Sequence, residues 1–258
     1  MLEKVRKSAY SSPLYTAILV ALFAVVLFSF PNLFEIGETA AFILHIVCRV
    51  LAVFFAVLMA KACGFKFFAK PKFTVFYVLL FVIGVLVCAN NFPVIGFATG
   101  NVALNENAKI ARYLVYCAAI GVAEEFVFRG AVMPLVGMKF REKAHAPFLT
   151  VLVTSAVFSL CHLFNVFSAG IGPTLLQVGY TFLTGGLFCA AYLFTENLVF
   201  PVILHTLFDV GGLMFSPPFG IASGNMWDLI TVIITAVLGV AATAVYALAL
   251  WNYKKKEN

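Results

Sequence analysis

Charged residues are scarce in this 258-residue chain, at 11% of the total, whereas hydrophobic residues make up 63% and the mean hydropathy is +1.05. Soluble domains carry roughly 25% charged residues, so the chain has too few charges to cover a water-exposed surface of its size. This shortage excludes soluble enzymes, nucleic-acid-binding proteins and secreted disulfide scaffolds. The composition instead predicts a polytopic membrane protein.

Two sequence patterns that would point to redox or zinc-protease chemistry are also missing. The six cysteines lie within or beside apolar runs and none forms a CxxC pair, so the sequence indicates neither a disulfide framework nor a thiol redox motif. No HExxH sequence occurs, which leaves the zincin mechanism without support. Candidate chemistry is therefore confined to the few ionisable residues inside the apolar runs.

Eight apolar stretches approach the roughly 20 residues that a helix needs to cross the hydrocarbon core of a bilayer. They cover approximately residues 14–30, 41–63, 73–89, 110–136, 147–167, 174–194, 198–215 and 227–251. We therefore predict an all-α, polytopic transmembrane bundle of about eight helices. We divide it into an N-terminal three-helix segment (1–109), a four-helix core with the candidate site (110–215), and a C-terminal helix with a basic tail (216–258).

Basic residues are concentrated in the N-terminal tail, the second and fourth connections and the C-terminal tail. This group, called here the basic collar, consists of Lys4, Arg6, Lys7, Lys61, Lys66, Lys70, Lys72, Lys139, Arg141, Lys143, Lys254, Lys255 and Lys256. In an eight-helix arrangement the whole collar lies on one side. Because cytoplasmic loops are enriched in Lys and Arg, we predict that both termini are cytoplasmic. The net charge of +6 then reflects topology, and no acidic partner or nucleic acid is expected.

Three short windows place ionisable residues inside apolar stretches, where a charge costs about 2.5 kcal/mol or more and is by default a functional candidate. The windows contain Glu124, Glu125 and Arg129; Phe158 and His162; and His205 and Asp209. At 1.5 Å of rise per residue, their depths are compatible with one shared site.

Helical spacing separates the roles of these residues. Glu125 and Arg129 are four residues apart with the acid first, which favours an ion pair. Glu124 points about 100° away around the helix, so this arginine does not readily neutralise it, and Glu124 is the candidate general base. His205 and Asp209 also share a helix face, so we expect Asp209 to orient the imidazole of His205.

The ordered motifs Glu124-Glu125-x-x-x-Arg129, Phe158-x-x-x-His162 and His205-x-x-x-Asp209 resemble those of the CPBP intramembrane proteases. This is also called the CAAX prenyl protease or ABI family, and it includes the Ras-converting CAAX endopeptidases. The resemblance covers about residues 113–212. It implies an intramembrane endopeptidase in which Glu124 activates water while His162 and His205 position that water and stabilise the oxyanion. It also implies a membrane-embedded, lipidated or prenylated peptide or protein as substrate, and a bacterial cell membrane as the expected location.

The cofactor stays open at this point. Glu124, His162, His205 and Asp209 together could form a zinc set of His and carboxylate ligands. The family resemblance favours the metal-independent alternative, in which a glutamate and water suffice. We therefore expect no cofactor and keep zinc as the alternative, with Phe158 as a packing residue beside the site.

Two other functional classes compete with the protease hypothesis. One is a non-catalytic membrane adaptor or bacteriocin-immunity protein that retains the motifs, and the other is a proton-coupled transporter that uses the buried acids as a relay. Outside the motifs, His45 and Arg49 share a helix face. We interpret this pair as a source of interhelical hydrogen bonds or of contacts with lipid headgroups.

Overall fold

A computed structural model of the protein describes residues 2–71, 74–225 and 229–253. The described chain is mostly helical, as the sequence predicts. Four members of the basic collar, Lys72, Lys254, Lys255 and Lys256, lie outside the described residues, as do the first two residues of the last apolar stretch (227–228).

Each of the eight apolar stretches coincides with helix. The helices are α2 (Pro13–Ser29), α3 (Glu38–Cys63), α4 (Val75–Ala89), α6 (Ile110–Val127), α7 (Met133–Phe140), α8 (Ala146–Cys161), α10 (Ile171–Thr195), α11 (Val199–Gly212) and α12 (Leu229–Trp251). Helices α6 and α7 form one continuous rod through the π-helical turn η2 (Phe128–Val132).

Five helical segments in the described part of the chain are long and apolar enough to cross a membrane. They are Pro13–Leu33, Glu38–Cys63, Ala146–Ala169, Ile171–Thr195 and Leu229–Trp251. Helices α4 and α11 are apolar but shorter. The protein is therefore an integral membrane protein, while the count of eight spans and the cytoplasmic location of the termini stay predictions.

The connections contain structure that hydrophobic periodicity did not indicate. The additional elements are α1 (Leu2–Ser11), η1 (Phe30–Leu33), α5 (Val94–Thr99), β1 (Val102–Leu104) and β2 (Ala222–Gly224). Within the predicted stretch 147–167, α8 is followed by η3 (His162–Asn165) and α9 (Val166–Ala169). Strands β1 and β2 pair antiparallel with Ala103 opposite Ser223, so they join the connection before α6 to the connection after α11. A pair of three-residue strands depends on contacts between distant segments and leaves no periodic signal in the sequence.

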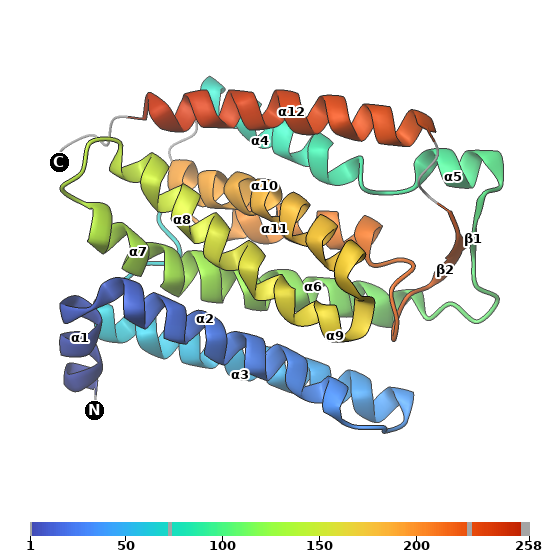
Figure 1. The fold of residues 1–258 in the computed structure, drawn as a ribbon, viewed down its shortest axis with the longest axis horizontal. Helices are drawn as coiled ribbons and strands as arrows, with labels where there is room; N and C mark the ends of the chain where they lie inside the picture. Colours follow the sequence, from blue (N-terminus) through green and yellow to red (C-terminus); the bar gives the residue numbers. More distant parts are fainter. Residues whose placement is uncertain (1, 72–73, 226–228, 254–258) are drawn as a thin grey trace.

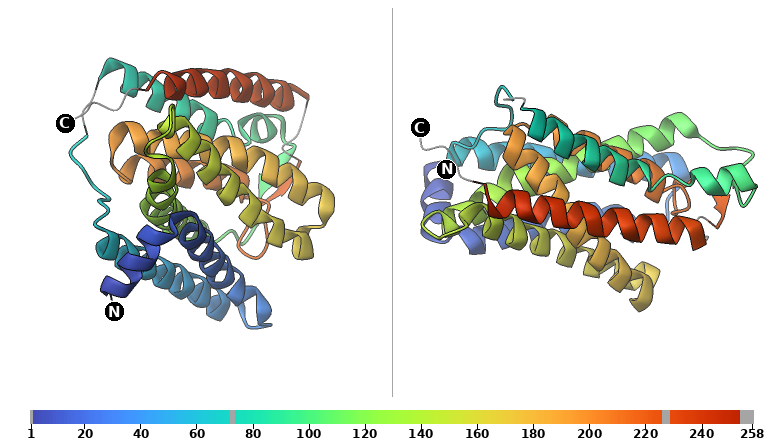
Figure 2. Two further views of the ribbon diagram at one scale, coloured as in Figure 1. Left: turned by 60° about the vertical axis from the view of Figure 1, so that its left-hand side comes forward. Right: turned by 90° about the horizontal axis from the view of Figure 1, so that it is seen from above.

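The motif-bearing helices occupy the middle of the bundle (Figures 1 and 2). Helices α6, α8, α10 and α11 pack on one another, with the α2–α3 pair on one side and α4 with α12 on the other. This enclosure matters because the ionisable residues of the motifs face protein in place of lipid.

The described part of the basic collar gathers at one end of the bundle. The Tyr10 hydroxyl of α1 donates to the Cys63 carbonyl at the end of α3. The connection after α3 pairs with the connection after α10 through Phe68 and Asn197, and the turn before α8 stacks against the end of α12. The β1–β2 pair lies at the opposite end (Figure 1). The collar end and the strand end are thus distinct poles.

Candidate active site

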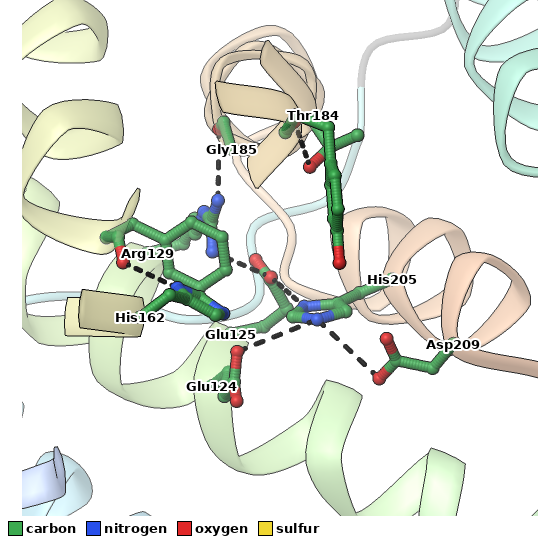
Figure 3. Close-up of polar contacts among 10 residues, drawn as sticks. Glu124, Glu125, Arg129, His162, Thr184, Gly185, His205 and Asp209 are labelled. Atoms are coloured by element: carbon green, nitrogen blue, oxygen red, sulfur yellow. Dashed lines mark hydrogen bonds and ion pairs between the residues drawn. The ribbon is translucent and has the colours of Figure 1, made fainter. Parts of the chain in front are cut away.

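The two glutamates of the first motif stand in the last turn of α6, immediately before the π-helical turn η2. Arg129 lies within that turn. Single π-turns in α-helices are rare and are found frequently at functional sites. The following contacts show which neighbouring helices these side chains reach (Figure 3).

Glu125 and Arg129 form the ion pair that their spacing predicts. Arg129 Nη1 lies 2.8 Å from Glu125 Oε1, and both side chains are fully buried. Arg129 Nη2 also donates to the Gly185 carbonyl of α10 at 3.0 Å. The guanidinium stands over the ring of Phe158, 4.6 Å from its centroid. Arg129 therefore ties α6 to α10 and to α8 at once.

Glu125 has a second partner that the sequence interpretation missed. Its Oε1 lies 2.7 Å from Nδ1 of His205 on α11. Because a carboxylate oxygen accepts, Nδ1 carries the proton and Nε2 is the nitrogen left for chemistry. The ring of Phe188 stacks on the imidazole at a centroid distance of 4.8 Å. The orientation of His205 is thus fixed by α6 and α10.

Asp209 lies beside His205 but makes a longer contact with the ring than Glu125 does. Asp209 Oδ2 lies 3.7 Å from His205 Nε2, too far for a hydrogen bond, whereas Glu125 contacts Nδ1 directly. The i,i+4 spacing on α11 does bring Asp209 beside the ring, but the imidazole turns its Nδ1 toward α6. Glu125 therefore makes the closer contact with His205, in addition to its ion pair with Arg129.

Close approach of α6 and α11 makes this contact possible. A Cβ atom at Gly121 would lie only 2.6 Å from Thr206 Oγ1, so a larger side chain there would push the helices apart. Because Gly121 is one turn before Glu125 and Thr206 directly follows His205, this glycine determines how closely the carboxylate approaches the imidazole.

Glu124 faces a different environment from its neighbour. Its Oε2 lies 3.7 Å from His205 Nε2, and its side chain is 18% exposed, against 0% for Glu125. Asp209 Oδ2 lies at the same distance from Nε2 and has no hydrogen-bond partner among the described residues. Three polar atoms, one each from Glu124, His205 and Asp209, therefore converge without direct hydrogen bonds, a separation that suits a small polar group placed between them.

His162 approaches the same region from the end of α8. Its Nδ1 donates to the Phe158 carbonyl at 3.0 Å, which leaves Nε2 free. The ring of Phe158 is edge-on to His162 at 5.0 Å and to His205 at 6.0 Å. Among the described residues, no hydrogen bond or ion pair joins His162 to Glu124, Glu125, His205 or Asp209. Figure 3 shows it on the Glu124 side of the group.

The residues of the alternative zinc set do not meet as a ligand group. Among the described residues, no three or more His, Cys, Asp or Glu side chains are placed so that they could hold a metal ion. Glu124, His205 and Asp209 are near one another, but His162 is joined to them through Phe158. We therefore assign no step of the chemistry to a metal.

Comparison with known proteins gives one match. Residues 106–211 match the family described as type II CAAX prenyl endopeptidase Rce1-like. No curated protein and no solved structure matches this chain. The matched region contains all three motifs, so the family resemblance carried by those motifs is confirmed. The part of the chain that contains the motifs is therefore similar to the CAAX proteases.

Proposed function

We propose that this protein is an intramembrane endopeptidase that hydrolyses a peptide bond of a membrane-embedded or lipidated peptide with a water activated by Glu124. The observation that carries the proposal is the contrast between two adjacent carboxylates. Glu125 is fully buried and contacts Arg129 and His205 through Oε1, whereas Glu124 is partly exposed and faces the open nitrogen of His205.

The reaction follows from this placement. Glu124 takes a proton from a water molecule held near His205 Nε2, and the oxygen of that water attacks the carbonyl carbon of the scissile bond. For this step His162 and His205 each carry a proton on Nε2 as well as on Nδ1, and they donate hydrogen bonds from Nε2 to the oxyanion of the tetrahedral intermediate. Glu124 then returns its proton to the leaving amine as the carbon–nitrogen bond breaks, which regenerates the carboxylate and releases two peptides.

Glu125 and Arg129 act in this scheme by holding His205. The ion pair fixes the Glu125 carboxylate, and the carboxylate fixes the proton of His205 on Nδ1. Asp209 completes the polar surface beside Nε2. The scheme requires no metal, and zinc bound through Glu124, His162, His205 and Asp209 is the alternative that the experiment below separates.

The proposed topology has eight crossings with both termini in the cytoplasm. It is supported by the gathering of the described basic collar at one end of the bundle and by the helical state of all eight apolar stretches. Labelling of the cysteine variants Lys66→Cys and Ala103→Cys, in intact cells and in lysed cells, tests this topology. Ala103→Cys should react with a reagent added outside intact cells, and Lys66→Cys should react only after lysis.

The function is tested by comparing membrane peptides from cells that express the wild type, Glu124→Gln or Glu106→Gln. Glu106 is an exposed acid away from the site and serves as the matched control. We expect one or more cleavage products in the wild type and the control, and a decrease of about 10²- to 10⁴-fold in Glu124→Gln, because general-base catalysis contributes this much.

The same comparison discriminates among the alternatives. Equal products, or an equal cellular phenotype, in all three strains would contradict proteolysis and favour an adaptor or immunity function. Activity that depends on a proton gradient without any cleaved peptide would favour transport. Cleavage by the purified protein that persists with a chelator supports the metal-free scheme, and cleavage that is lost and then restored by zinc contradicts it.

A further inference from the structure

The C-terminal end of α11 is held by side chains that lie outside the three motifs. The hydroxyl of Tyr113 on α6 donates to the carbonyl of Val210 at 2.8 Å and shares its proton with the carbonyl of Asp209 at 3.1 Å. The side-chain amide of Asn91, in the turn after α4, donates to the carbonyl of Phe208 at 2.8 Å. Three successive carbonyls of α11 therefore accept hydrogen bonds from two other segments of the chain.

These bonds lie where a helix needs outside donors. The last four carbonyls of an α-helix have no partner within the helix, and in α11, which ends at Gly212, they include those of Asp209 and Val210. The N–H of Leu213 reaches the Asp209 carbonyl, and Tyr113 supplies the bond to Val210. Tyr113 is only 1% exposed. Because its ring is enclosed, its hydroxyl has a fixed position from which to hold the helix end.

Close packing accompanies the contact of Asn91 with α11. A Cβ atom at Gly211 would lie 2.4 Å from the backbone carbonyl of Asn91, and one at Gly212 would lie 2.6 Å from the Asn91 amide nitrogen. These two glycines let the turn after α4 lie directly against the end of α11. Near the middle of α11, Gly121 of α6 lies as close to Thr206. The helix therefore has little room to shift at either level.

Asp209 connects these contacts to the candidate active site. Its carbonyl accepts from Tyr113, and its carboxylate Oδ2 lies 3.7 Å from His205 Nε2. Glu125 contacts the other ring nitrogen of His205, one turn earlier on α11. Helix α6 thus contacts α11 at two levels, and it also carries Glu124. The distance of 3.7 Å between Glu124 Oε2 and His205 Nε2 therefore depends on how these contacts rotate and place α11.

We infer that Tyr113 is a positioning residue for the proposed hydrolysis, with Asn91 as its support. By holding the end of α11, the two side chains keep His205 and Asp209 turned toward Glu124. The inference rests on the proposed function for the reaction that is served, but the hold on α11 can be measured without it. A misplacement of about 1 Å can lower the rate of an enzyme about 100-fold. Loss of one hydroxyl here should therefore reduce turnover far more than the same loss elsewhere.

Tyr246 provides a matched control. It is also buried, and its hydroxyl donates to the Leu80 carbonyl. This bond joins α12 to α4, two helices that carry none of the three motifs. Tyr113→Phe and Tyr246→Phe therefore make the same chemical change, with the ring kept, at one interface that includes motif helices and at one that does not.

The first measurement is hydrogen–deuterium exchange in the purified, detergent-solubilised full chain, followed by mass spectrometry of peptides that cover residues 205–214. Tyr113→Phe should speed exchange there by about 3- to 10-fold, the range that one neutral hydrogen bond provides. Tyr246→Phe should leave exchange in this segment as it is in the wild type. Unchanged exchange of the segment in Tyr113→Phe overturns the inference and requires no substrate.

The second measurement uses a synthetic peptide that spans the bond cleaved in the comparison of membrane peptides. We expect Tyr113→Phe to lower kcat about 10- to 100-fold and to leave KM unchanged, because the residue acts through α11 and not on the bound peptide. Tyr246→Phe should keep both constants. A role limited to stability predicts equal kcat for the two variants, and that result overturns the inference, as does a rise in KM with kcat unchanged.

Asn91→Ala keeps the inference testable if Tyr113→Phe does not fold, because Asn91 is partly exposed and lies in a turn. We expect exchange of residues 205–214 to be about 3- to 10-fold faster and kcat to be lower by a similar factor at constant KM. Asn90→Ala is its matched control, since the Asn90 amide donates to Thr235 of α12 and not to α11. Equal results for these two variants overturn the inference.

The two measurements separate this inference from the proposed function. If the wild type cleaves the peptide, but exchange of α11 or kcat does not respond to Tyr113→Phe, the inference alone fails. If exchange responds, but the wild type cleaves no membrane peptide, the proposed function fails while the hold of Tyr113 on α11 stands.

Discussion

Two buried arginines of this protein, Arg129 and Arg49, have similar local geometry and different partners. Each contacts a side chain four residues earlier on its own helix, reaches a second helix, and lies against aromatic rings. The residue four positions earlier is Glu125 for Arg129 and His45 for Arg49. Arg129 is consequently neutralised inside the protein, while Arg49 keeps an unbalanced charge.

This difference separates a buried charge that is paired with an acid from one that has no acid in contact with it. Arg129 contacts the carboxylate of Glu125, the carbonyl of Gly185 and the rings of Phe158 and Phe188. Removing it would strand an acid in a low-dielectric interior. Removing Arg49 strands no acid in contact with it. The same substitution at the two positions should therefore have very different consequences.

Arg129→Gln should have the largest effect on stability. It leaves Glu125 buried without a cation, which costs about 3–5 kcal/mol, and it frees the carboxylate that holds His205. Unfolding of the detergent-solubilised protein, followed by circular dichroism, measures the loss. The double variant Glu125→Gln with Arg129→Gln should regain part of it, and a single variant within about 1 kcal/mol of the wild type would contradict the closed ion pair.

Gly185→Ala, which changes the packing around Arg129, should have an intermediate effect on stability. Its Cβ would lie 2.9 Å from Phe158 Cδ1 and 3.6 Å from Arg129 Nη2, and overpacking of this kind costs about 1–3 kcal/mol. Gly186→Ala is the matched control, because its Cβ would make an ordinary contact at 3.6 Å with Ser155 Oγ. If both variants melt at the same temperature, Gly185 is not needed for the packing around Arg129.

Arg49→Gln should have the smallest effect on stability. The variant loses the hydrogen bonds of Arg49 to His45 and Tyr116, and each such bond contributes about 0.5–3 kcal/mol. Removal of a buried charge offsets part of that loss. The expected change is below about 1.5 kcal/mol, measured in the same unfolding assay. A loss as large as that of Arg129→Gln would show that Arg49 is a structural charge and would remove the distinction between the two arginines.

Interactions within one helix are the part of the site that the sequence predicts well. The spacing of Glu125 and Arg129 indicates their ion pair, and long apolar runs indicate the helices, because both patterns depend on a fixed helical period. The contact between Glu125 and His205 joins residues 80 positions apart. It depends on how closely α6 approaches α11, which no local pattern contains.

The same limit explains why the sequence did not indicate Glu125 as a partner of His205 or Tyr116 as a partner of Arg49. A shared helix face places Asp209 beside His205 but does not determine which ring nitrogen faces it. Tyr116 lies 67 positions from Arg49 and shows no motif. A buried arginine without a neighbouring acid was nevertheless visible in the sequence. The division into three domains, the catalytic roles and the absence of a cofactor stay predictions.

The π-helical turn at Phe128–Val132 determines how the side-chain faces of α6 and α7 are rotated relative to each other about their common axis. A π-turn contains one more residue than an α-helical turn, and each residue contributes about 100° of rotation. The face presented by the glutamates is therefore offset from the face that continues into α7. Deleting one residue from this turn would leave the rod nearly as long but would swing the carboxylates away from α11. The extra residue acts as a rotational spacer that lets one rod present the glutamates to α11 and still pack its far end against α2 and α8.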